Sequence, residues 1–150
     1  MTKMSKNELA EQMADLTYEL LENCQLKIER TAHKLNLTIA EFKLLRSLQA
    51  DEKLSAGALA KRLGLSSSRI TRIIDGLVSK DLVIKEVAGK DHRVVEIRLT
   101  EAGKVSRDQL NAMYVTVHQE IINLLPSDTE ESVVLAMQKL RQATEEWVKD

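Results

Sequence analysis

The sequence predicts a mainly α-helical fold that carries one small β-hairpin. Apolar residues recur at helical spacing through most of the chain, and the period shortens to that of a strand only in the stretch after Lys80. The 150 residues include one proline and five glycines, so long linkers are not expected. Long helices at both ends of the chain would flank a central lobe.

The amino-acid composition is that of an ordinary globular protein. Hydrophobic residues make up 43% and charged residues 30% of the chain, and no apolar run is long enough to span a bilayer. The N-terminal stretch MTKMSKNELAEQ lacks the apolar core of a signal peptide, and the single cysteine cannot form an internal disulfide. We therefore expect a cytoplasmic protein with no membrane partner.

The net charge of −1 conceals an uneven distribution of charge along the chain. Residues 55–98 hold nine Lys and Arg against five Asp and Glu, a balance of +4, whereas the other 13 basic and 18 acidic residues give −5. A basic centre within an acidic frame is typical of a protein that binds a polyanion, although charged stretches also occur on ordinary solvated faces.

The first helix is expected over about residues 5–34, and a second helix begins near residue 38. Apolar side chains of the first helix recur at spacings of three and four and form one stripe: Leu9, Met13, Leu16, Leu20, Cys24 and Ile28. In the segment LTIAEFKLLRSL, Thr38 and Glu41 have the spacing of a capping box, which predicts the start of the second helix.

Residues 55–79 contain two short helices with a tight turn between them. Ser55 can cap the first helix, Gly64 can form the turn, and Ser66 can cap the second helix. The buried stripe of the second helix is expected to be Ile70, Ile73, Ile74, Leu77 and Val78. Two helices joined by a short turn with a glycine form a helix-turn-helix motif.

A β-hairpin and two more helices complete the chain. LVIKEV and VVEIRL alternate like strands, and AGKDH between them forms the turn. Thr100 can cap the next helix, which Pro126 ends, and Ser127 with Glu130 has the spacing of a capping box for the last helix. A helix-turn-helix followed at once by a basic hairpin is a winged helix, which long helices extend here at both ends of the chain.

The second helix of the helix-turn-helix has a polar face suited to the major groove of DNA. Opposite its apolar stripe lie Ser68, Arg69, Arg72, Asp75 and Ser79, with Thr71 at the edge. Arginine can pair with guanine through two hydrogen bonds, and the N-terminus of a helix favours a phosphate. The predicted DNA-binding residues of this helix are Ser66, Ser67, Ser68, Arg69, Thr71 and Arg72. The alternative is an ordinary solvated helix face.

The tip of the hairpin predicts a second contact with DNA. Lys90, His92 and Arg93 would project from a narrow loop, a shape that fits the minor groove, where the negative potential attracts arginine. Phosphate would repel Asp91, so we expect Asp91 to brace the loop or Arg93. Neighbouring residues at a strand tip point apart, and no nucleophile or oxyanion hole accompanies Asp91 and His92. No catalytic residue is predicted, and the chain is not expected to be an enzyme.

The run from SAGALAKRLGLSSSRITRIIDGLVSKDLV to GKDHRVVEIRLTEAG resembles the MarR-type transcriptional regulators. Their wing signature has an Asp and an Arg two residues apart, alternating apolar residues, a Leu-Thr pair and a Gly; the matching residues are Asp91, Arg93, Leu99, Thr100 and Gly103. Many members carry a second Arg beside the wing Arg, whereas His92 and Val94 flank it in this chain. The segment LTIAEFKLLRSL also looks like the second helix of that family, so the resemblance covers nearly the whole chain. It implies a dimer built from the first and last helices, with the recognition helices in successive major grooves and Arg93 in the minor groove.

We expect one domain over residues 1–150, with a winged-helix DNA-binding lobe at about residues 38–100 and dimerisation helices at about 5–34 and 101–149. The apolar stripes of the terminal helices exceed what the lobe could cover, and a twofold interface would bury them. The predicted interface residues are Leu9, Met13, Leu16, Leu20, Met137, Leu140 and Trp147. Two recognition helices about 34 Å apart would read a pseudo-palindromic operator.

Neither a redox sensor nor a metal sensor is predicted. Cys24 lies on the apolar stripe of the first helix, which favours a buried structural thiol over a peroxide-sensing one. His33, His92 and His118 are far apart and lack the spacing of a metal site, although clustering in three dimensions stays open. No metal and no cofactor are expected.

Proteins similar to the MarR-type regulators often bind small aromatic acids or phenols in a cleft between the dimerisation helices and the DNA-binding lobe, which weakens DNA binding. A small aromatic or phenolic ligand is therefore a candidate effector. Polar groups that could serve are Tyr18, Arg30, Arg46 and Tyr114, which the sequence does not separate from surface residues.

Together these observations predict a homodimeric, sequence-specific, DNA-binding transcriptional regulator. We expect a repressor that binds a pseudo-palindromic operator and is released by a small ligand. Two alternatives stay open: a non-specific or architectural DNA binder that uses the same surface, and a dimeric interaction protein whose winged helix has lost DNA binding.

Overall fold

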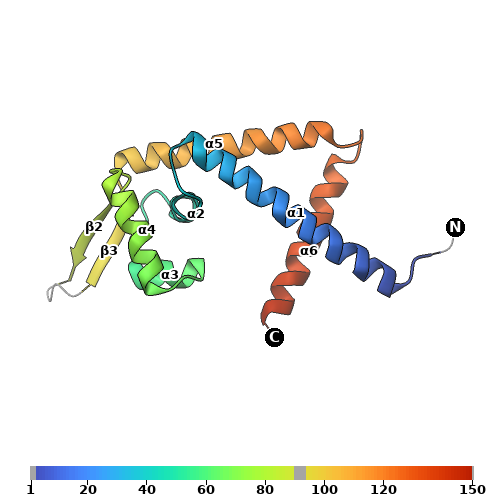
Figure 1. Cartoon of the computed structure of the whole chain (residues 1–150), viewed down its shortest axis with the longest axis horizontal. Helices are drawn as coiled ribbons and strands as arrows, with labels where there is room; N and C mark the ends of the chain where they lie inside the picture. Colours follow the sequence, from blue (N-terminus) through green and yellow to red (C-terminus); the bar gives the residue numbers. More distant parts are fainter. Residues whose placement is uncertain (1–2, 90–93, 150) are drawn as a thin grey trace. The chain divides into compact units, whose positions relative to one another are not determined.

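A computed structural model describes residues 3–89 and 94–149 of the chain (Figure 1). The elements follow in the order α1 (Lys6–Lys34), α2 (Ile39–Ser47), β1 (Leu54–Ser55), α3 (Ala56–Leu63), α4 (Ser67–Ser79), β2 (Val83–Ala88), β3 (Val94–Leu99), α5 (Glu101–Leu124) and α6 (Glu130–Lys149). The predicted fold, mainly α-helical with a small β-hairpin wing, is confirmed. The chain divides into two units, Met1–Tyr114 and Val115–Asp150, with the boundary inside α5. That the whole chain acts as one domain stays a prediction.

Three predicted helix caps form as expected. The side-chain oxygens of Ser55, Ser66 and Thr100 accept hydrogen bonds from the backbone N–H three residues later, at 3.1, 3.4 and 2.9 Å. Gly64 ends α3 in the left-handed region with a φ of 64°, where a residue without a Cβ is unstrained. Ser55 and Gly64 thus set the two ends of α3, Ser66 sets the start of α4, and Thr100 sets the start of α5.

The predicted capping box of α2 forms only in part. The Glu41 N–H donates to Thr38 Oγ1 at 3.1 Å, so Thr38 caps the helix. The Glu41 carboxylate does not return to the cap, because it lies buried beside Lys80, whose Nζ is 2.8 Å from Oε2. An ion pair between α2 and the end of α4 takes the place of the reciprocal hydrogen bond.

The predicted capping box at the start of α6 is wrong. The helix begins at Glu130, so the residue before it is Thr129 and Ser127 lies two positions further upstream. A capping box that the sequence analysis missed opens α1 instead: Ser5 N donates to Glu8 Oε2 at 2.7 Å, and Glu8 N donates to Ser5 Oγ at 3.2 Å. The two sites have the same spacing, so the pattern alone could not separate them.

The wing belongs to a three-stranded antiparallel sheet with the order β1-β3-β2. Val83 of β2 pairs with Leu99 of β3, and Leu54 of β1 pairs with Ile97 on the other side of β3. The sequence predicted β2 and β3 and missed β1, because a strand of two residues shows no alternation. Through β1, the segment before α3 pairs with strand β3 of the wing.

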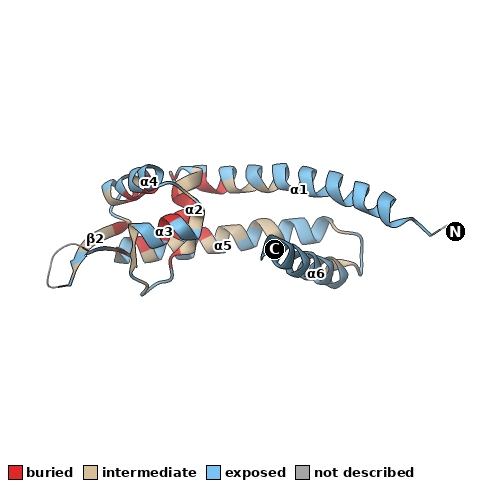
Figure 2. Ribbon diagram, turned by 90° about the horizontal axis from the view of Figure 1, so that it is seen from below, coloured by how far each residue is buried: buried red, intermediate tan, exposed pale blue. Residues whose placement is uncertain are grey.

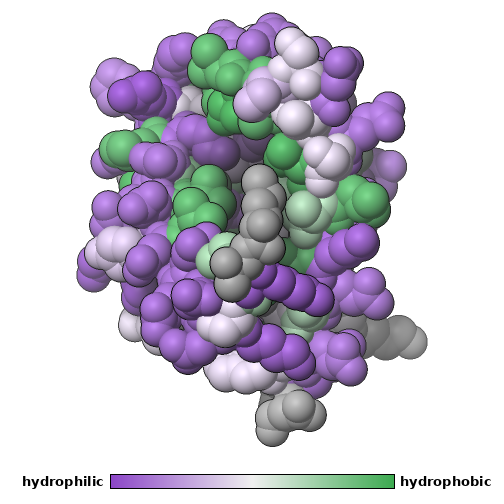
Figure 3. Space-filling model, turned by 90° about the vertical axis from the view of Figure 1, so that its right-hand side faces the viewer, coloured by the Kyte–Doolittle hydropathy of each residue, from purple (hydrophilic) through white to green (hydrophobic). Residues whose placement is uncertain are grey.

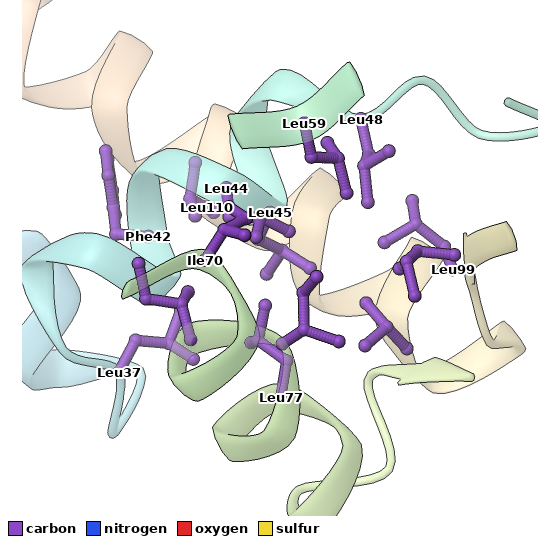
Figure 4. Close-up of a cluster of buried hydrophobic side chains, with 14 of the residues drawn as sticks. Leu37, Phe42, Leu44, Leu45, Leu48, Leu59, Ile70, Leu77, Leu99 and Leu110 are labelled. Atoms are coloured by element: carbon purple, nitrogen blue, oxygen red, sulfur yellow. The ribbon is translucent and has the colours of Figure 1, made fainter. Parts of the chain in front are cut away.

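The core of the first unit lies between α2, α3, α4 and the sheet (Figure 4). The helices α1 and α5 each contribute one buried apolar residue to it, Ala32 and Leu110. Its fully buried large side chains are Phe42, Leu44, Leu45, Leu48, Leu59, Ile70, Ile74, Leu77, Val83, Ile97, Leu99 and Leu110. Each buried side chain of this size contributes about 1.5–3 kcal/mol relative to exposure. The core therefore holds the helix-turn-helix and the wing together as one packed body.

The terminal helices leave most of their apolar side chains exposed (Figure 2). In α1 the buried residues are Thr31 and Ala32, and none of the residues of α6 is buried. The side chains predicted for a dimer interface are between 38% and 78% exposed: Leu9, Met13, Leu16, Leu20, Met137, Leu140 and Trp147. Hydrophobic surface also stands out among polar residues in the space-filling view (Figure 3). Such surface is unusual for a monomer.

Candidate nucleic-acid interface

Helix α4 separates its side chains into a buried apolar face and an exposed polar face. Ile70, Ile73, Ile74 and Leu77 are buried against the core. The predicted DNA-binding residues at this helix are all exposed: Ser66, Ser67, Ser68, Arg69, Thr71 and Arg72. Because the apolar face holds the helix on the lobe, its polar face is presented to solvent in a fixed orientation.

The hydroxyl groups at the start of α4 are not equivalent. Ser66 Oγ accepts the Arg69 N–H as the helix cap and lies 3.3 Å from Ser68 Oγ. Thr71 Oγ1 donates to the Ser67 carbonyl oxygen at 2.8 Å. Ser66 and Thr71 thus help to hold the helix, whereas the Ser67 hydroxyl forms no hydrogen bond within residues 3–89 and 94–149.

The arginines of α4 carry positive charge that no described acid compensates. Neither Arg69 nor Arg72 forms an ion pair with a residue in the described part of the chain, and both are exposed. Other basic residues of the lobe do have acidic partners, namely Arg62 with Glu52, Lys80 with Glu41, Lys85 with Asp75, and Arg98 with Glu86. Arg69 and Arg72 therefore leave uncompensated positive charge on the polar face of α4.

Two of these ion pairs also shift the pKa of the acid. Two hydrogen bonds from the Arg62 guanidinium, at 2.6 and 3.0 Å, and one from the Gln49 N–H lower the pKa of Glu52 to about 2. The hydrogen bond from Arg98 lowers the pKa of Glu86 in the same direction. Both carboxylates are therefore ionised at neutral pH and offset the charge of their partners.

The wing rises from β2 and β3 toward a tip at which Gly89 has a φ of 85°. Within the hairpin, Glu86 Oε1 lies 2.7 Å from Arg98 and Oε2 lies 3.7 Å from Lys53, so one acid joins two cations across the sheet. The predicted tip residues Lys90, Asp91, His92 and Arg93 lie outside the described residues, and their proposed roles stay predictions.

An ion pair that the sequence analysis missed joins the polar face of α4 to the wing. Lys85 of β2 lies against the carboxylate of Asp75, in the region where α4 runs beside β2 (Figure 1). A signal for it was present, since Asp75 was placed on the polar face of α4 and Lys85 in the basic stretch. Their pairing needs the turn of the chain between α4 and β2, which a helical projection does not include.

The described residues show no grouping typical of a metal site. No three His, Cys, Asp or Glu side chains come together within 3–89 and 94–149.

Cys24 is partly exposed, so the predicted burial of its thiol is not met in the single chain, because this part of α1 runs beyond the core. No helix in the described ranges is both long and apolar enough to cross a membrane.

Comparison of the sequence with known proteins points to one protein family. A model of the MarR family matches residues 35–94. The HTH-type transcriptional regulator SarZ of Staphylococcus aureus is 30% identical over 112 residues, which cover 75% of this chain and 76% of SarZ.

Solved structures share the fold at lower identity. The YusO protein of Bacillus subtilis has a TM-score of 0.75 at 23% identity, over 93% of this chain and 99% of that one. Wild-type MarR of Escherichia coli in its apo form has a TM-score of 0.75 at 22% identity, over 93% and 98%. The fold of these solved structures agrees with the helix-turn-helix, the wing and the terminal helices described above. The chain belongs to the MarR family of transcriptional regulators.

Proposed function

We propose that this protein is a sequence-specific, double-stranded-DNA-binding regulator that acts as a repressor. The main observation that supports this proposal is the polar face of α4, where Arg69 and Arg72 are exposed and have no acidic partner in the described part of the chain. A helix in the major groove needs such a face, because bidentate arginine contacts distinguish guanine from other bases. Ser67 and Ser68, at the N-terminus of the same helix, are suited to a phosphate.

A homodimer follows from the terminal helices. The exposed apolar side chains of α1 and α6 have no cover in one chain, and a twofold interface would remove them from water. Two copies of α4 related by a twofold axis would read two half-sites about 34 Å apart. The operator of this regulator is therefore proposed to be pseudo-palindromic.

A small aromatic or phenolic ligand is proposed as the effector that releases DNA. Arg46 lies over the Tyr114 ring, 4.3 Å from its centroid, and Phe42 meets the same ring edge-on with a centroid distance of 5.9 Å. The Arg46 guanidinium on the Tyr114 ring is suited to pair with the acid group of an aromatic ligand. Dissociation of the protein–DNA complex by small aromatic acids or by phenols would test this class of ligand.

Fluorescence anisotropy tests the proposed DNA binding directly. The full chain is titrated against a labelled duplex from upstream of its own gene and against a scrambled duplex of equal length, at several salt concentrations. A preference of about a thousandfold for the upstream duplex supports a specific regulator. Equal affinities that fall steeply with salt would identify a non-specific or architectural binder. A tight dimer without DNA affinity at low salt would identify an interaction protein.

A further inference from the structure

The ion pair between Asp75 and Lys85 lies on the surface that we propose to face DNA. Asp75 is on the polar face of α4, and its side chain is 56% exposed. Lys85 reaches it from β2, and its side chain is 42% exposed. Within the described residues this is the one ion pair that joins α4 to the sheet.

The position of Asp75 raises a problem for DNA binding. Residues three apart on a helix are neighbours, so a carboxylate at position 75 is within reach of the guanidinium of Arg72. An ion pair between Arg72 and Asp75 would compete with a base or a phosphate for the same guanidinium. No such pair forms, because the Asp75 carboxylate is turned to Lys85.

We propose that Lys85 is a positioning residue for Arg72. By holding Asp75, Lys85 neutralises a negative charge on the DNA-facing surface and leaves the Arg72 guanidinium free to bind. The inference rests on the proposed function, since it assigns the element that keeps the recognition arginine available. Lys85 thereby couples strand β2 of the wing to the recognition helix.

A direct contact between Lys85 and a phosphate is the rival role. The placement of Lys85 on the sheet disfavours that role. The register partner of Lys85 on β3 is the buried Ile97, so both side chains leave the face of the sheet that packs on the core. Its ammonium group is already paired with Asp75.

A double-mutant cycle on DNA separates these two roles. Lys85→Met keeps most of the aliphatic chain and removes the charge, and Asp75→Asn keeps the shape of the carboxylate. Because an exposed ion pair shifts an equilibrium by about fivefold at most, Lys85→Met should weaken operator binding by up to about fivefold for each half-site. In the Asp75→Asn background, Lys85→Met should have no further effect. The slope of log affinity against log salt should not change.

A loss that persists in the Asp75→Asn background overturns the inference. Together with a salt slope reduced by about one, it would make Lys85 a phosphate contact. The wild-type chain measured against a scrambled duplex tests the proposed function separately. Equal affinity for both duplexes would overturn the proposal of a sequence-specific regulator. The coupling between Lys85, Asp75 and Arg72 would then be tested by a second measurement on the protein without DNA.

That second measurement is the hydrogen exchange of the Arg72 Nε–H group, observed by NMR without DNA. Exchange should slow in Lys85→Met, because Asp75 then binds Arg72, and should return to the wild-type rate in the double variant. The Arg69 Nε–H group is the matched control and should not respond, since Asp75 lies six positions away on the helix. Identical Arg72 exchange rates in the wild type and in Lys85→Met would overturn the inference.

Discussion

Gly103 lies against the backbone carbonyl group of Leu82, so closely that a Cβ at position 103 would stand 1.9 Å from the carbonyl oxygen and 2.9 Å from its carbon. The same oxygen accepts the Thr100 N–H at 3.1 Å, and Thr100 Oγ1 donates to the Asp81 carbonyl oxygen at 2.5 Å. The first turn of α5 is therefore packed directly on the segment that leads into β2. Two of the residues that follow the wing, Thr100 and Gly103, take part in this contact.

Gly103→Ala should destabilise the fold by about 3 kcal/mol, because backbone atoms cannot yield to the added methyl group as a flexible side chain would. Urea unfolding followed by circular dichroism would show a lower midpoint with an unchanged slope. Gly57→Ala in α3 is the matched control: the nearest atom to its Cβ would be Ser55 Oγ at 3.9 Å. The control should be neutral or more stable by up to about 1 kcal/mol. Similar stability of both variants would contradict the proposed close contact.

Most of the architecture could be predicted from the sequence because its signals are local. The caps at Ser55, Ser66 and Thr100 each depend on an N–H group three residues away, and the buried stripe of α4 depends on helical spacing alone. The same pattern failed at Ser127, since a second hydroxyl residue, Thr129, lies two positions later and directly precedes α6.

The partners of the charged groups could not be predicted because they come from distant parts of the chain. Glu41 has the spacing of a capping residue, yet its carboxylate pairs with Lys80 across the interface between α2 and α4. Asp75 belongs by periodicity to the solvated face of α4, yet it pairs with Lys85. Sequence reasoning identified the candidate DNA-binding face and missed the contact that keeps one of its arginines free.

Glu52→Gln should remove a part of the stability that depends on pH. Glu52 has a pKa of about 2 in the folded chain, against an ordinary value of 4.5. A lowered pKa stabilises the fold fully above the ordinary value, and the gain is lost as the pH falls from about 4.5 toward 2. The wild type should therefore melt at a higher temperature than Glu52→Gln at pH 7, and the difference should disappear near pH 2.

Thermal melts of both proteins between pH 2 and pH 7 would measure this difference. Glu19→Gln is a suitable control, because Glu19 is an exposed carboxylate of α1 without an ion pair in the described part of the chain. The control should alter the melting temperature little at any pH in this range. A constant difference between the wild type and Glu52→Gln down to pH 2 would contradict the role of the bond from Arg62.

Leu16→Asp should dissociate the proposed dimer. Leu16 is 56% exposed on the apolar stripe of α1. In a twofold interface the substitution would bury two carboxylates without partners, one from each subunit, which is unfavourable. Sedimentation equilibrium should show a dimer for the wild type and a monomer for the variant. Val87→Asp on β2, outside the predicted dimerisation helices, is matched in exposure at 57% and should remain dimeric. A Leu16→Asp protein that stays dimeric at micromolar concentration would remove Leu16 from the interface.

Arg93→Ala should weaken DNA binding and leave the dimer intact. The prediction comes from the sequence, which places Arg93 at the wing tip, where a minor groove would attract its charge. Anisotropy titrations would measure the affinity, and sedimentation would check the dimer. Lys139→Ala removes an exposed cation of α6 and serves as the control for a general loss of charge. Unchanged affinity of Arg93→Ala would exclude the wing from the interface.

Arg72→Ala should cost more on the operator than on random DNA. Arg72 is exposed on α4 opposite the buried stripe, and a bidentate contact with guanine gives about 1–3 kcal/mol of discrimination. A lost phosphate contact would weaken binding to both duplexes equally. Titration of each variant against operator and scrambled duplexes at fixed salt measures the ratio. Arg141→Ala, the same change on α6, should leave that ratio unchanged. If Arg72→Ala weakens binding to both duplexes equally, Arg72 binds only the DNA backbone and the sequence must be read by another residue.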